Sequence, residues 1–396
     1  MNPASRILAI NGGSSSLKFA LFDSEDLRRE LSGAIEGIGQ GRAVLAVESG
    51  SGAPPERSEV DAADHDRAGE RLLEWISRRA VLSSIAGIGH RIVHGGTDLL
   101  DHRRVTPEVM RKLDAARPLD PAHLPSEIAL IAAASRLLPG VPQFACFDTA
   151  FHRGLPRVAQ LLPIPRAYLD AGVRRLGFHG LSYEYLIGAL RRAAGDRAAE
   201  SRVILAHLGS GASLAALAGG KPVDTTMGFT PAAGLIMGTR PGDLDPGLLV
   251  YLVRSEKMSA ERLDAFVNQE CGLKGVSGTT SNMKALEERS AADPRAAEAF
   301  DLFCYRAVQW IGAYAAVLGG LDVLVFSGGI GERSSAVRRE ICSRLEFLHA
   351  ALDETSNEAH GAVISDSRSA VSIRVIPTDE EVVIARIVRE KLKEGR

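Results

Sequence analysis

The sequence lacks the features that mark secreted, membrane-spanning or nucleic-acid-binding proteins. Its four cysteines lie far apart and form no CxxC motif, so we expect a reduced, cytoplasmic protein without structural zinc. No apolar run approaches the roughly 18 residues of a membrane-spanning helix, and the run near the N-terminus is too short for a signal peptide. The net charge of −2 provides no basic footprint for nucleic acid or an anionic membrane.

Several catalytic motifs are also missing. There is no GxxxxGK[ST] segment, which excludes a P-loop NTPase. No GxGxxG opens a βαβ unit and no HRD precedes a DFG, so neither a dinucleotide-binding nor a protein-kinase interpretation holds. Without HExxH or closely spaced His/Asp sets, we expect no transition-metal site made of protein ligands alone.

Glycine, in contrast, is abundant. Forty glycines against six tyrosines and two tryptophans indicate tight turns and close backbone approaches in an α/β protein. A chain of 396 residues is long enough for two domains. The proline-rich segment 151–165 is the clearest linker, so we place the domain boundary after residue 150.

An internal echo supports two domains of related fold. Residues 6–22 and 202–218 both read as an apolar strand, a glycine-serine turn and a second apolar strand, which predicts two similar hairpins. Further short apolar runs predict strands at 87–93, 142–148 and 321–326.

Helical patterns and loops complete the secondary-structure prediction. Apolar spacing predicts helices over 66–80 and 298–318, the second apolar nearly all round and therefore buried between layers. A last helix over 378–393 begins with Thr378 and Glu381, the pattern of a capping box. Residues 49–61 read as a surface loop.

Three glycine-rich turns, 11–18, 207–213 and 327–332, each follow an apolar strand. Glycine lets backbone amides approach anionic oxygens, and serine hydroxyls add donors. A single Gly/Ser turn is more often only a turn, but three together indicate nucleotide binding.

Polar residues at strand ends form a second signal. Arg91, His179 and Arg240 lie in glycine-flanked segments, and Asp148 directly follows an apolar run. Each arginine either pairs with a carboxylate or binds an anion, and the residue pattern leaves both alternatives open. A lone histidine such as His207 is more often part of a core than a catalyst.

The motifs NGGSSSLK, GHRIVHGG, FDTAFH, GFHG, HLGSGAS, GTRPGDLDPG, SGGIGE and TDEE follow one another in the order and spacing of the acetate kinase family, from Asn11 to Glu381. The chain therefore resembles that family. The resemblance implies an α/β fold of the actin-like ATPase superfamily, with two ribonuclease-H-like domains around a nucleotide cleft, usually in a homodimer. It places residues 1–150 and 380–396 in the N-terminal domain and 151–379 in a nucleotide-binding domain.

The resemblance also implies an ATP:acetate phosphotransferase with ATP or ADP as substrate. Asn11, Asp148 and Glu380 would organise Mg²⁺, with Mn²⁺ as an alternative, and Asp148 would lie nearest the chemistry. Arg91 and Arg240 would hold acetate and the transferring phosphoryl group, with His179 donating to its oxygens. The pocket for the methyl group would comprise Val93, Leu119, Phe178 and Pro231. Residues along the nucleotide would be Ser14, Ser16, Lys18, His207, Gly209, Ser210, Gly211, Asn282, Lys284, Gly329, Ile330, Gly331 and Arg333.

These residue types suit the chemistry. Acetate is already ionised at neutral pH and needs no strong general base. The reaction instead requires positioning of two anions and stabilisation of charge on three equatorial oxygens, which arginine, histidine and Mg²⁺ can provide.

Some positions differ from the family pattern. Asp120 lies where a histidine is expected, and His123 follows on the next turn. Ser210 and Arg333 replace asparagines, while Asn282 and Lys284 replace aspartate and arginine. These changes lie around the expected positions of the nucleotide's phosphates and base, so they affect the choice of donor nucleotide more than the type of reaction.

Two alternatives remain at this stage. One is a propionate or other short-chain acyl kinase, although Val93 favours acetate because a smaller residue would make room for another methylene. The other is a non-catalytic nucleotide-binding paralogue. Retention of the metal, arginine and histidine positions argues against it, because binding alone does not need them all.

Overall fold

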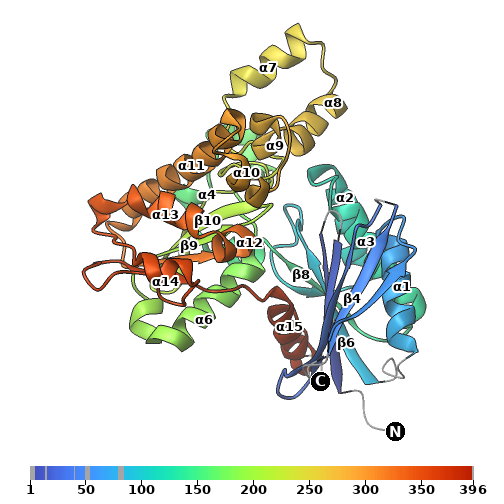
Figure 1. Ribbon diagram of the computed structural model, residues 1–396. Coiled ribbons are helices and arrows are strands. Elements are labelled where there is room, and N and C mark those ends of the chain that lie inside the picture. Colours follow the sequence, from blue (N-terminus) through green and yellow to red (C-terminus); the bar gives the residue numbers. More distant parts are fainter. Residues whose placement is uncertain (1–4, 14–15, 40, 50–53, 79–83, 395–396) are drawn as a thin grey trace. The chain divides into compact units, whose positions relative to one another are not determined.

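The chain divides into two compact units in a computed structural model that describes residues 5–13, 16–39, 41–49, 54–78 and 84–394. The first unit comprises Met1–Arg153 and Asp379–Arg396, and the second comprises Gly154–Thr378 (Figure 1).

The described part of the first unit is built on an eight-stranded mixed sheet. In spatial order its strands are β5 (Glu56–Val60), β4 (Ala43–Ser49), β3 (Arg29–Glu36), β2 (Ser16–Asp23), β1 (Arg6–Gly12), β6 (Ile85–Ile92), β8 (Gln143–Phe147) and β7 (Arg103–Arg104). Its helices are α1 (His65–Ser77), α2 (Pro107–Ala116), α3 (Leu124–Leu137) and α15 (Glu380–Glu394).

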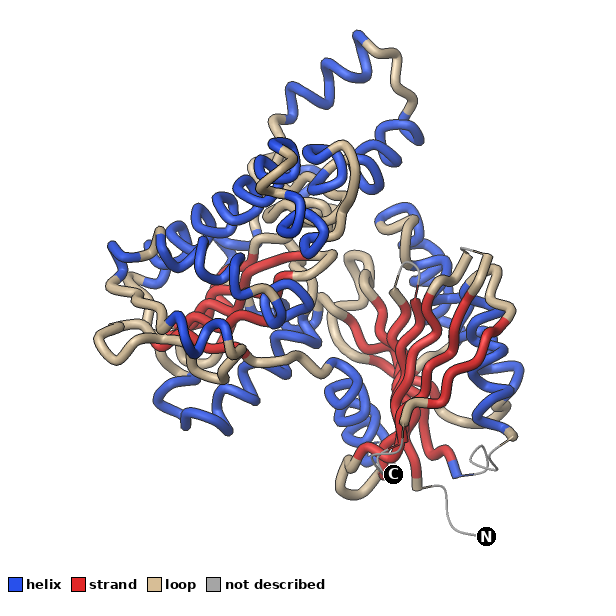
Figure 2. Tube along the Cα trace, viewed as in Figure 1, coloured by secondary structure: helices blue, strands red, loops and turns tan. Residues whose placement is uncertain are grey.

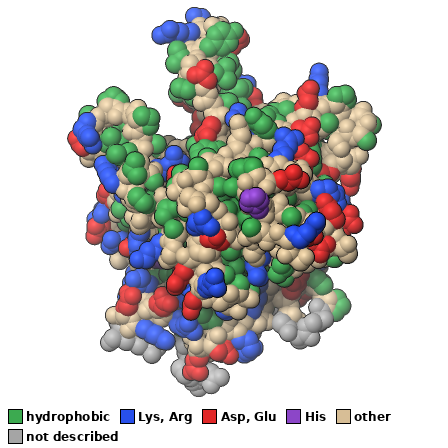
Figure 3. Space-filling view, turned by 90° about the vertical axis from the view of Figure 1, so that its left-hand side faces the viewer, with side chains coloured by type: hydrophobic (Ala, Val, Ile, Leu, Met, Phe, Trp, Pro, Cys, Tyr) green, Lys and Arg blue, Asp and Glu red, His purple; other side chains and the backbone are tan. Residues whose placement is uncertain are grey.

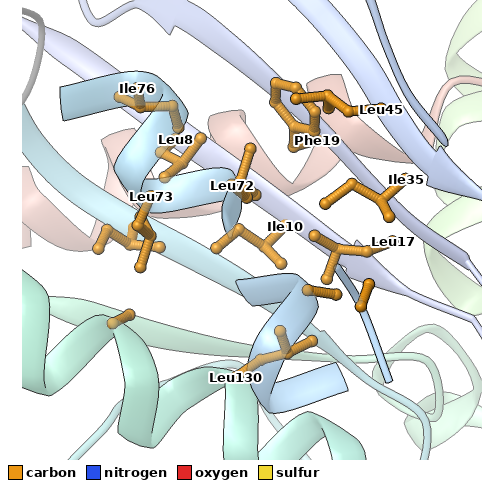
Figure 4. Close-up of a cluster of buried hydrophobic side chains, with 14 of the residues drawn as sticks. Leu8, Ile10, Leu17, Phe19, Ile35, Leu45, Leu72, Leu73, Ile76 and Leu130 are labelled. Carbon is orange, nitrogen blue, oxygen red and sulfur yellow. The ribbon is translucent and has the colours of Figure 1, made fainter. Parts of the chain in front are cut away.

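One face of this sheet packs against α1 and α3. The apolar residues that alternate along β1 and β2 point toward apolar side chains of the two helices (Figure 4). This buried cluster includes Leu8, Ile10, Leu17, Phe19, Leu72, Leu73, Ile76 and Leu130. The core of the first unit therefore lies between the sheet and these helices.

Helix α15 covers the opposite face, over β1 and β6 (Figure 2). Two glycines of β6 allow this approach. A Cβ atom at Gly89 would lie 2.3 Å from Cγ2 of Ile384, and one at Gly87 would lie 2.9 Å from Cγ1 of Val388. The glycines of the GIGHRIV segment thus fix where the returning C-terminal helix lies on the sheet.

The described part of the second unit has a five-stranded sheet. In spatial order its strands are β11 (Lys221–Thr225), β10 (Ala212–Ala218), β9 (Val203–Leu208), β12 (Val323–Ser327) and β13 (Ser372–Val375). Its helices are α4 (Arg157–Gln160), α5 (Arg166–Asp170), α6 (Gly180–Ala199), α7 (Pro246–Ser255), α8 (Ala260–Ala265), α9 (Gly272–Ser277), α10 (Met283–Arg289), α11 (Pro294–Leu318), α12 (Gly328–Arg333), α13 (Ser335–Ser343) and α14 (Glu354–Glu358).

The two sheets share one topology, which confirms the predicted internal repeat of residues 6–22 and 202–218. β1 and β2 form an antiparallel hairpin, as do β9 and β10. In each unit the first strand then pairs in parallel with a later strand, which pairs in parallel with the next. The order β3-β2-β1-β6-β8 thus corresponds to β11-β10-β9-β12-β13.

Two segments differ from the sequence-based prediction. Residues 327–332, expected as an open turn, form the short helix α12 after Gly328 adopts a positive φ of 76°. The predicted loop 49–61 contains β5, whose exposed polar residues extend the edge of the sheet. Exposed edge strands carry little apolar signal, so the sequence pattern of this segment predicts a loop.

Two helices also differ in detail. Helix α11 is amphipathic and not buried all round, since Tyr305 and Val317 are 46% and 58% exposed. The predicted capping box of α15 is wrong. Asp379 accepts the Val382 N–H at 3.2 Å, whereas the side chain of Thr378 bonds to Ser182.

Candidate active site

Arg91 and Asp148 meet at the carboxyl ends of two neighbouring parallel strands. Arg91 lies near the end of β6 and Asp148 follows β8, with Ile92 paired to Phe147 between them. The Arg91 Nη2 and Nε atoms donate to Oδ2 of Asp148 at 2.6 and 3.0 Å, and Asp148 is fully buried. The structure thus gives Arg91 a carboxylate partner, without deciding whether Arg91 also binds a substrate anion.

The returning helix adds two carboxylates to this end of the sheet. Nδ2 of Asn11, in β1, donates to Oε2 of Glu380 at 2.9 Å and to Oε1 of Glu381 at 3.1 Å. Glu380 Oε2 also lies 3.9 Å from Nε of Arg91. The predicted metal residues Asn11, Asp148 and Glu380 therefore lie together around one guanidinium. Glu381, expected to cap its helix, belongs to the same cluster.

Negative charge exceeds positive charge in this cluster. Burial raises the pKa of Asp148 to about 6, and Glu380 adds to the shift against the opposing pull of Arg91. Burial alone would lower the pKa of Arg91, but Asp148 and Glu380 reverse this and raise it. Among the described residues, Oδ1 of Asp148 is buried without a hydrogen-bond partner. A buried carboxylate oxygen of this kind favours a further cation or donor.

A second group of acidic residues lies behind Arg91. Both carboxylate oxygens of the buried Glu127 accept the N–H of Val93, at 3.2 and 3.1 Å, and burial raises the pKa of Glu127 well above its ordinary value. Asp120, also buried, accepts from Nδ1 of His123 at 2.9 Å. Sequence analysis missed Glu127, although it is the one acidic residue within the apolar helix α3.

In the second unit, two histidines stack on each other. The rings of His179 and His207 lie 4.3 Å apart with an interplanar angle of 24°. Their Nδ1 atoms face serine hydroxyls, that of Ser213 at 2.8 Å and that of Ser182 at 2.9 Å. His179 itself has a φ of 57°, which turns the chain sharply into α6.

The predicted phosphate turn lies against these histidines and Arg240. A Cβ atom at Gly211 would lie 3.0 Å from Nη2 of Arg240 and 3.2 Å from Nε2 of His179. One at Gly209 would lie 3.7 Å from N of Gly329 and 3.9 Å from Nε2 of His207. A side chain at Gly211 would crowd Arg240 and His179, so cationic, imidazole and backbone donors converge on this turn.

The predicted methyl-pocket residues are distributed over both units. Val93 is buried and Leu119 packs on a buried apolar cluster in the first unit. Phe178 is buried in the second unit. In the same unit, the carbonyl of Pro231 accepts a hydrogen bond from Nη1 of Arg240 at 2.6 Å.

The remaining nucleotide residues are mostly exposed. Ser210, Lys18 and Gly329 are exposed, as is Arg333 at the end of α12, while Ser16 and Ile330 are half-buried and Gly331 is buried. Asn282 caps α10 by accepting the Ala285 N–H at 3.2 Å. The side chain of Lys284 is 84% exposed and lies 3.9 Å from Glu288. Ser14 lies outside the described residues.

Two properties of the described residues bear on the predicted partners. None of the described helices has the length and apolar character needed to cross a membrane. On the face drawn in Figure 3, acidic and basic side chains are interspersed and not gathered by sign.

The chain is similar to known proteins over nearly its whole length. The family model of the Acetokinase family matches residues 6–386. The chain is 42% identical to an acetate kinase of Rhodopseudomonas palustris, over 98% of this chain and 99% of that protein. It is also 42% identical to a propionate kinase of Citrobacter rodentium, over 97% and 96%.

A solved structure agrees with the sequence comparisons. The acetate kinase of Porphyromonas gingivalis superposes with a TM-score of 0.84 at 36% identity, covering 97% of this chain and 99% of that one. The chain therefore belongs to the acetokinase family and has the actin-like, two-unit α/β fold of acetate kinases.

Proposed function

We propose that the chain transfers the γ-phosphoryl group of ATP to the carboxylate of acetate, giving acetyl phosphate and ADP, and that it catalyses the reverse reaction. The observation that carries this proposal is the buried Arg91–Asp148 pair, in which Oδ1 of Asp148 has no hydrogen-bond partner among the described residues. Such a cluster serves anion and cation binding, and phosphoryl transfer to a carboxylate needs both.

In this proposal the arginines and histidines share the positioning of the two anions. Arg91 binds the acetate carboxylate, and Arg240 binds the phosphoryl group in transfer. His179 donates to the equatorial oxygens, while His207 and the amides of 209–211 bind the nucleotide phosphates. The carboxylate attacks phosphorus directly, so no general base is required.

The donor set fits Mg²⁺ and, as an alternative, Mn²⁺. Asn11, Asp148 and Glu380 supply the oxygen atoms that hard divalent cations prefer, and the excess negative charge around Arg91 favours such an ion. No group of three or more His, Cys, Asp or Glu residues arranged for metal binding occurs in the described ranges, which fits an ion held partly by substrate phosphates and water. When bound, the ion neutralises charge on the phosphates.

Acetate is the proposed acceptor and propionate the second candidate. The second candidate rests on the propionate kinase of Citrobacter rodentium, which is as similar as the acetate kinase of Rhodopseudomonas palustris. Val93, buried at the end of β6, limits the space for a longer acyl chain. One methylene discriminates by about 1–3 kcal/mol, so propionate should be the poorer substrate.

Trapping of acyl phosphates as hydroxamates tests the proposal. With ATP and Mg²⁺, acetate should give more acyl hydroxamate than propionate at equal concentration. Product from neither acid would support the non-catalytic paralogue, and a higher kcat/KM for propionate would support the second candidate.

Further proposals concern domains, assembly and location. We propose that the two units are domains and that the C-terminal helix returns to the first.

A homodimer is supported by α7, which has no buried residue and exposes Leu248, Val250, Tyr251 and Val253. Light scattering of the purified chain tests this assembly. A cytoplasmic location is supported by the free thiols of Cys271, Cys304 and Cys342, because reducing compartments keep thiols unpaired.

A further inference from the structure

The two stacked histidines of the second unit are each joined to a chain of hydroxyl groups. Ser213 lies between Nδ1 of His179 and the phenol of Tyr183, with which it makes a short hydrogen bond. Ser182 lies between Nδ1 of His207 and Oγ1 of Thr378, at 2.9 and 2.8 Å. Both serines are fully buried, so these hydroxyl contacts are shielded from bulk water.

We propose that Ser213 with Tyr183, and Ser182 with Thr378, are positioning residues that hold His179 and His207 as neutral tautomers with the ring proton on Nε2. An imidazole that accepts a hydrogen bond at Nδ1 carries its proton on Nε2. The two hydroxyl chains therefore decide which edge of each ring can donate.

In this proposal the hydrogen bonds beside His179 run toward its imidazole. The fully buried phenol of Tyr183, whose pKa burial raises, donates to Ser213. Ser213 has a single hydroxyl proton, which is then directed to Nδ1 of His179. Thr378 and Ser182 form the same sequence of groups toward His207.

Stacking of the two rings disfavours charge on both of them at once. Two imidazolium ions with ring centres 4.3 Å apart would repel each other. Two neutral rings avoid this repulsion and still present Nε2–H donors close to Gly209 and Gly211. Because the use of these donors on phosphate oxygens is part of the proposed function, this inference rests on that function.

The backbone of Thr378 connects the hydroxyl groups beside His207 to α12. Its N–H donates to Oε1 of Glu332 at 3.2 Å, and the same oxygen accepts the N–H of Gly328 at 2.9 Å. Thr378 is thus held from two sides, by the side chain of Glu332 in α12 and by Ser182. This fixed position keeps its hydroxyl group available to Ser182.

The test reads the tautomers directly. Long-range ¹H–¹⁵N spectra of the full chain, labelled at histidine, should show the Nε2–H pattern for His179 and His207 without nucleotide. Ser213→Ala should alter only the His179 pattern, and Ser182→Ala only the His207 pattern. By analogy with partners that orient metal-bound histidines, each should lower kcat by about 10–100-fold, with a smaller change in KM for acetate.

Matched variants separate positioning from general damage. Thr378→Val removes the hydroxyl at constant shape and should alter the His207 pattern, whereas Thr378→Ser should restore the pattern and turnover. Ser135→Ala deletes a serine hydroxyl of α3 in the first unit and should change neither. An Nδ1–H pattern in the wild type would overturn the inference. So would a histidine tautomer pattern that neither Ser213→Ala nor Ser182→Ala changes.

Combined readouts distinguish the two proposals. If the tautomers respond but turnover stays within twofold of wild type, the positioning role in the reaction is wrong. If the wild type makes no acyl phosphate while the tautomers respond as expected, the hydroxyl chains stand and the proposed function fails.

Discussion

At the scale of single residues, the two proposed substrate arginines differ in their partners. Arg91 is bound to a buried carboxylate, whereas Arg240 donates to the carbonyl of Pro231. We expect Arg240→Ala to lower kcat by about 10³-fold or more, in the range of arginines at phosphoryl transition states, with an unchanged melting temperature.

Arg91→Ala should lower kcat similarly and also destabilise the protein. The variant leaves Asp148 buried without its counter-ion, which costs about 3–5 kcal/mol when one partner of a buried pair is removed. Steady-state kinetics and thermal unfolding of both alanine variants check this. Near-normal turnover of a folded variant would contradict the assignment of that arginine.

His90 gives a prediction about acid stability. Its Nε2 lies 2.7 Å from Oε1 of Gln143, and burial lowers its pKa to about 4 from 6.5. The unfolded chain therefore takes up a proton first as the pH falls. The contribution of neutral His90 to the free energy of unfolding is therefore complete above pH 6.5. As the pH falls from 6.5 toward 4, this contribution is lost at about 1.4 kcal/mol per pH unit.

The control for this prediction is His90→Gln, which cannot titrate. Denaturant unfolding between pH 7.5 and 4.5 should show a shallower loss of unfolding free energy for the variant than for the wild type. Parallel pH profiles for the two proteins would show that His90 is not the responsible group.

At the scale of elements, the position of α15 depends on Gly87 and Gly89 of β6. We expect Gly89→Ala to destabilise the protein by about 1–3 kcal/mol, as overpacking does, because the new methyl group would meet Ile384. It should also raise the concentration of Mg²⁺ needed for half-maximal rate, since Glu380 begins the displaced helix.

Gly312→Ala is the matched control, since outside its own helix backbone the nearest described atom to the new Cβ would be Cζ of Phe347 at 3.8 Å. This change within α11 should be neutral or stabilising by up to about 1 kcal/mol. Equal melting temperatures for the two alanine variants, with equal Mg²⁺ dependence, would contradict the packing argument.

The strands and helices also differ in how well the sequence predicts them and their contacts. Both hairpins and the Arg91–Asp148 cluster follow from local patterns, because parallel strands bring their carboxyl ends to one edge. The contacts of Thr378 and Ser182 could not be predicted, since 196 positions separate them in the chain. Glu127 was missed for a similar reason, because its partner is a backbone N–H on another element.

At the scale of the whole molecule, the exposed residues near the proposed base site predict weak nucleotide selectivity. Asn282 uses its side-chain oxygen to cap α10, and Lys284 and Arg333 are exposed. Losing one base contact costs about 0.5–1.5 kcal/mol, so GTP and ITP should approach ATP in kcat/KM. A preference for ATP above about a hundredfold, which needs about 2.7 kcal/mol, would refute this.

The central claim is that the phosphoryl group of ATP is transferred to the carboxylate of acetate. Phosphorus NMR of the protein with ATP, Mg²⁺ and acetate follows every phosphorus species in one experiment. Acetyl phosphate and ADP should appear in equal amounts, and removing acetate should abolish ATP consumption. Release of inorganic phosphate with no acetyl phosphate, at any acetate concentration, would contradict this claim.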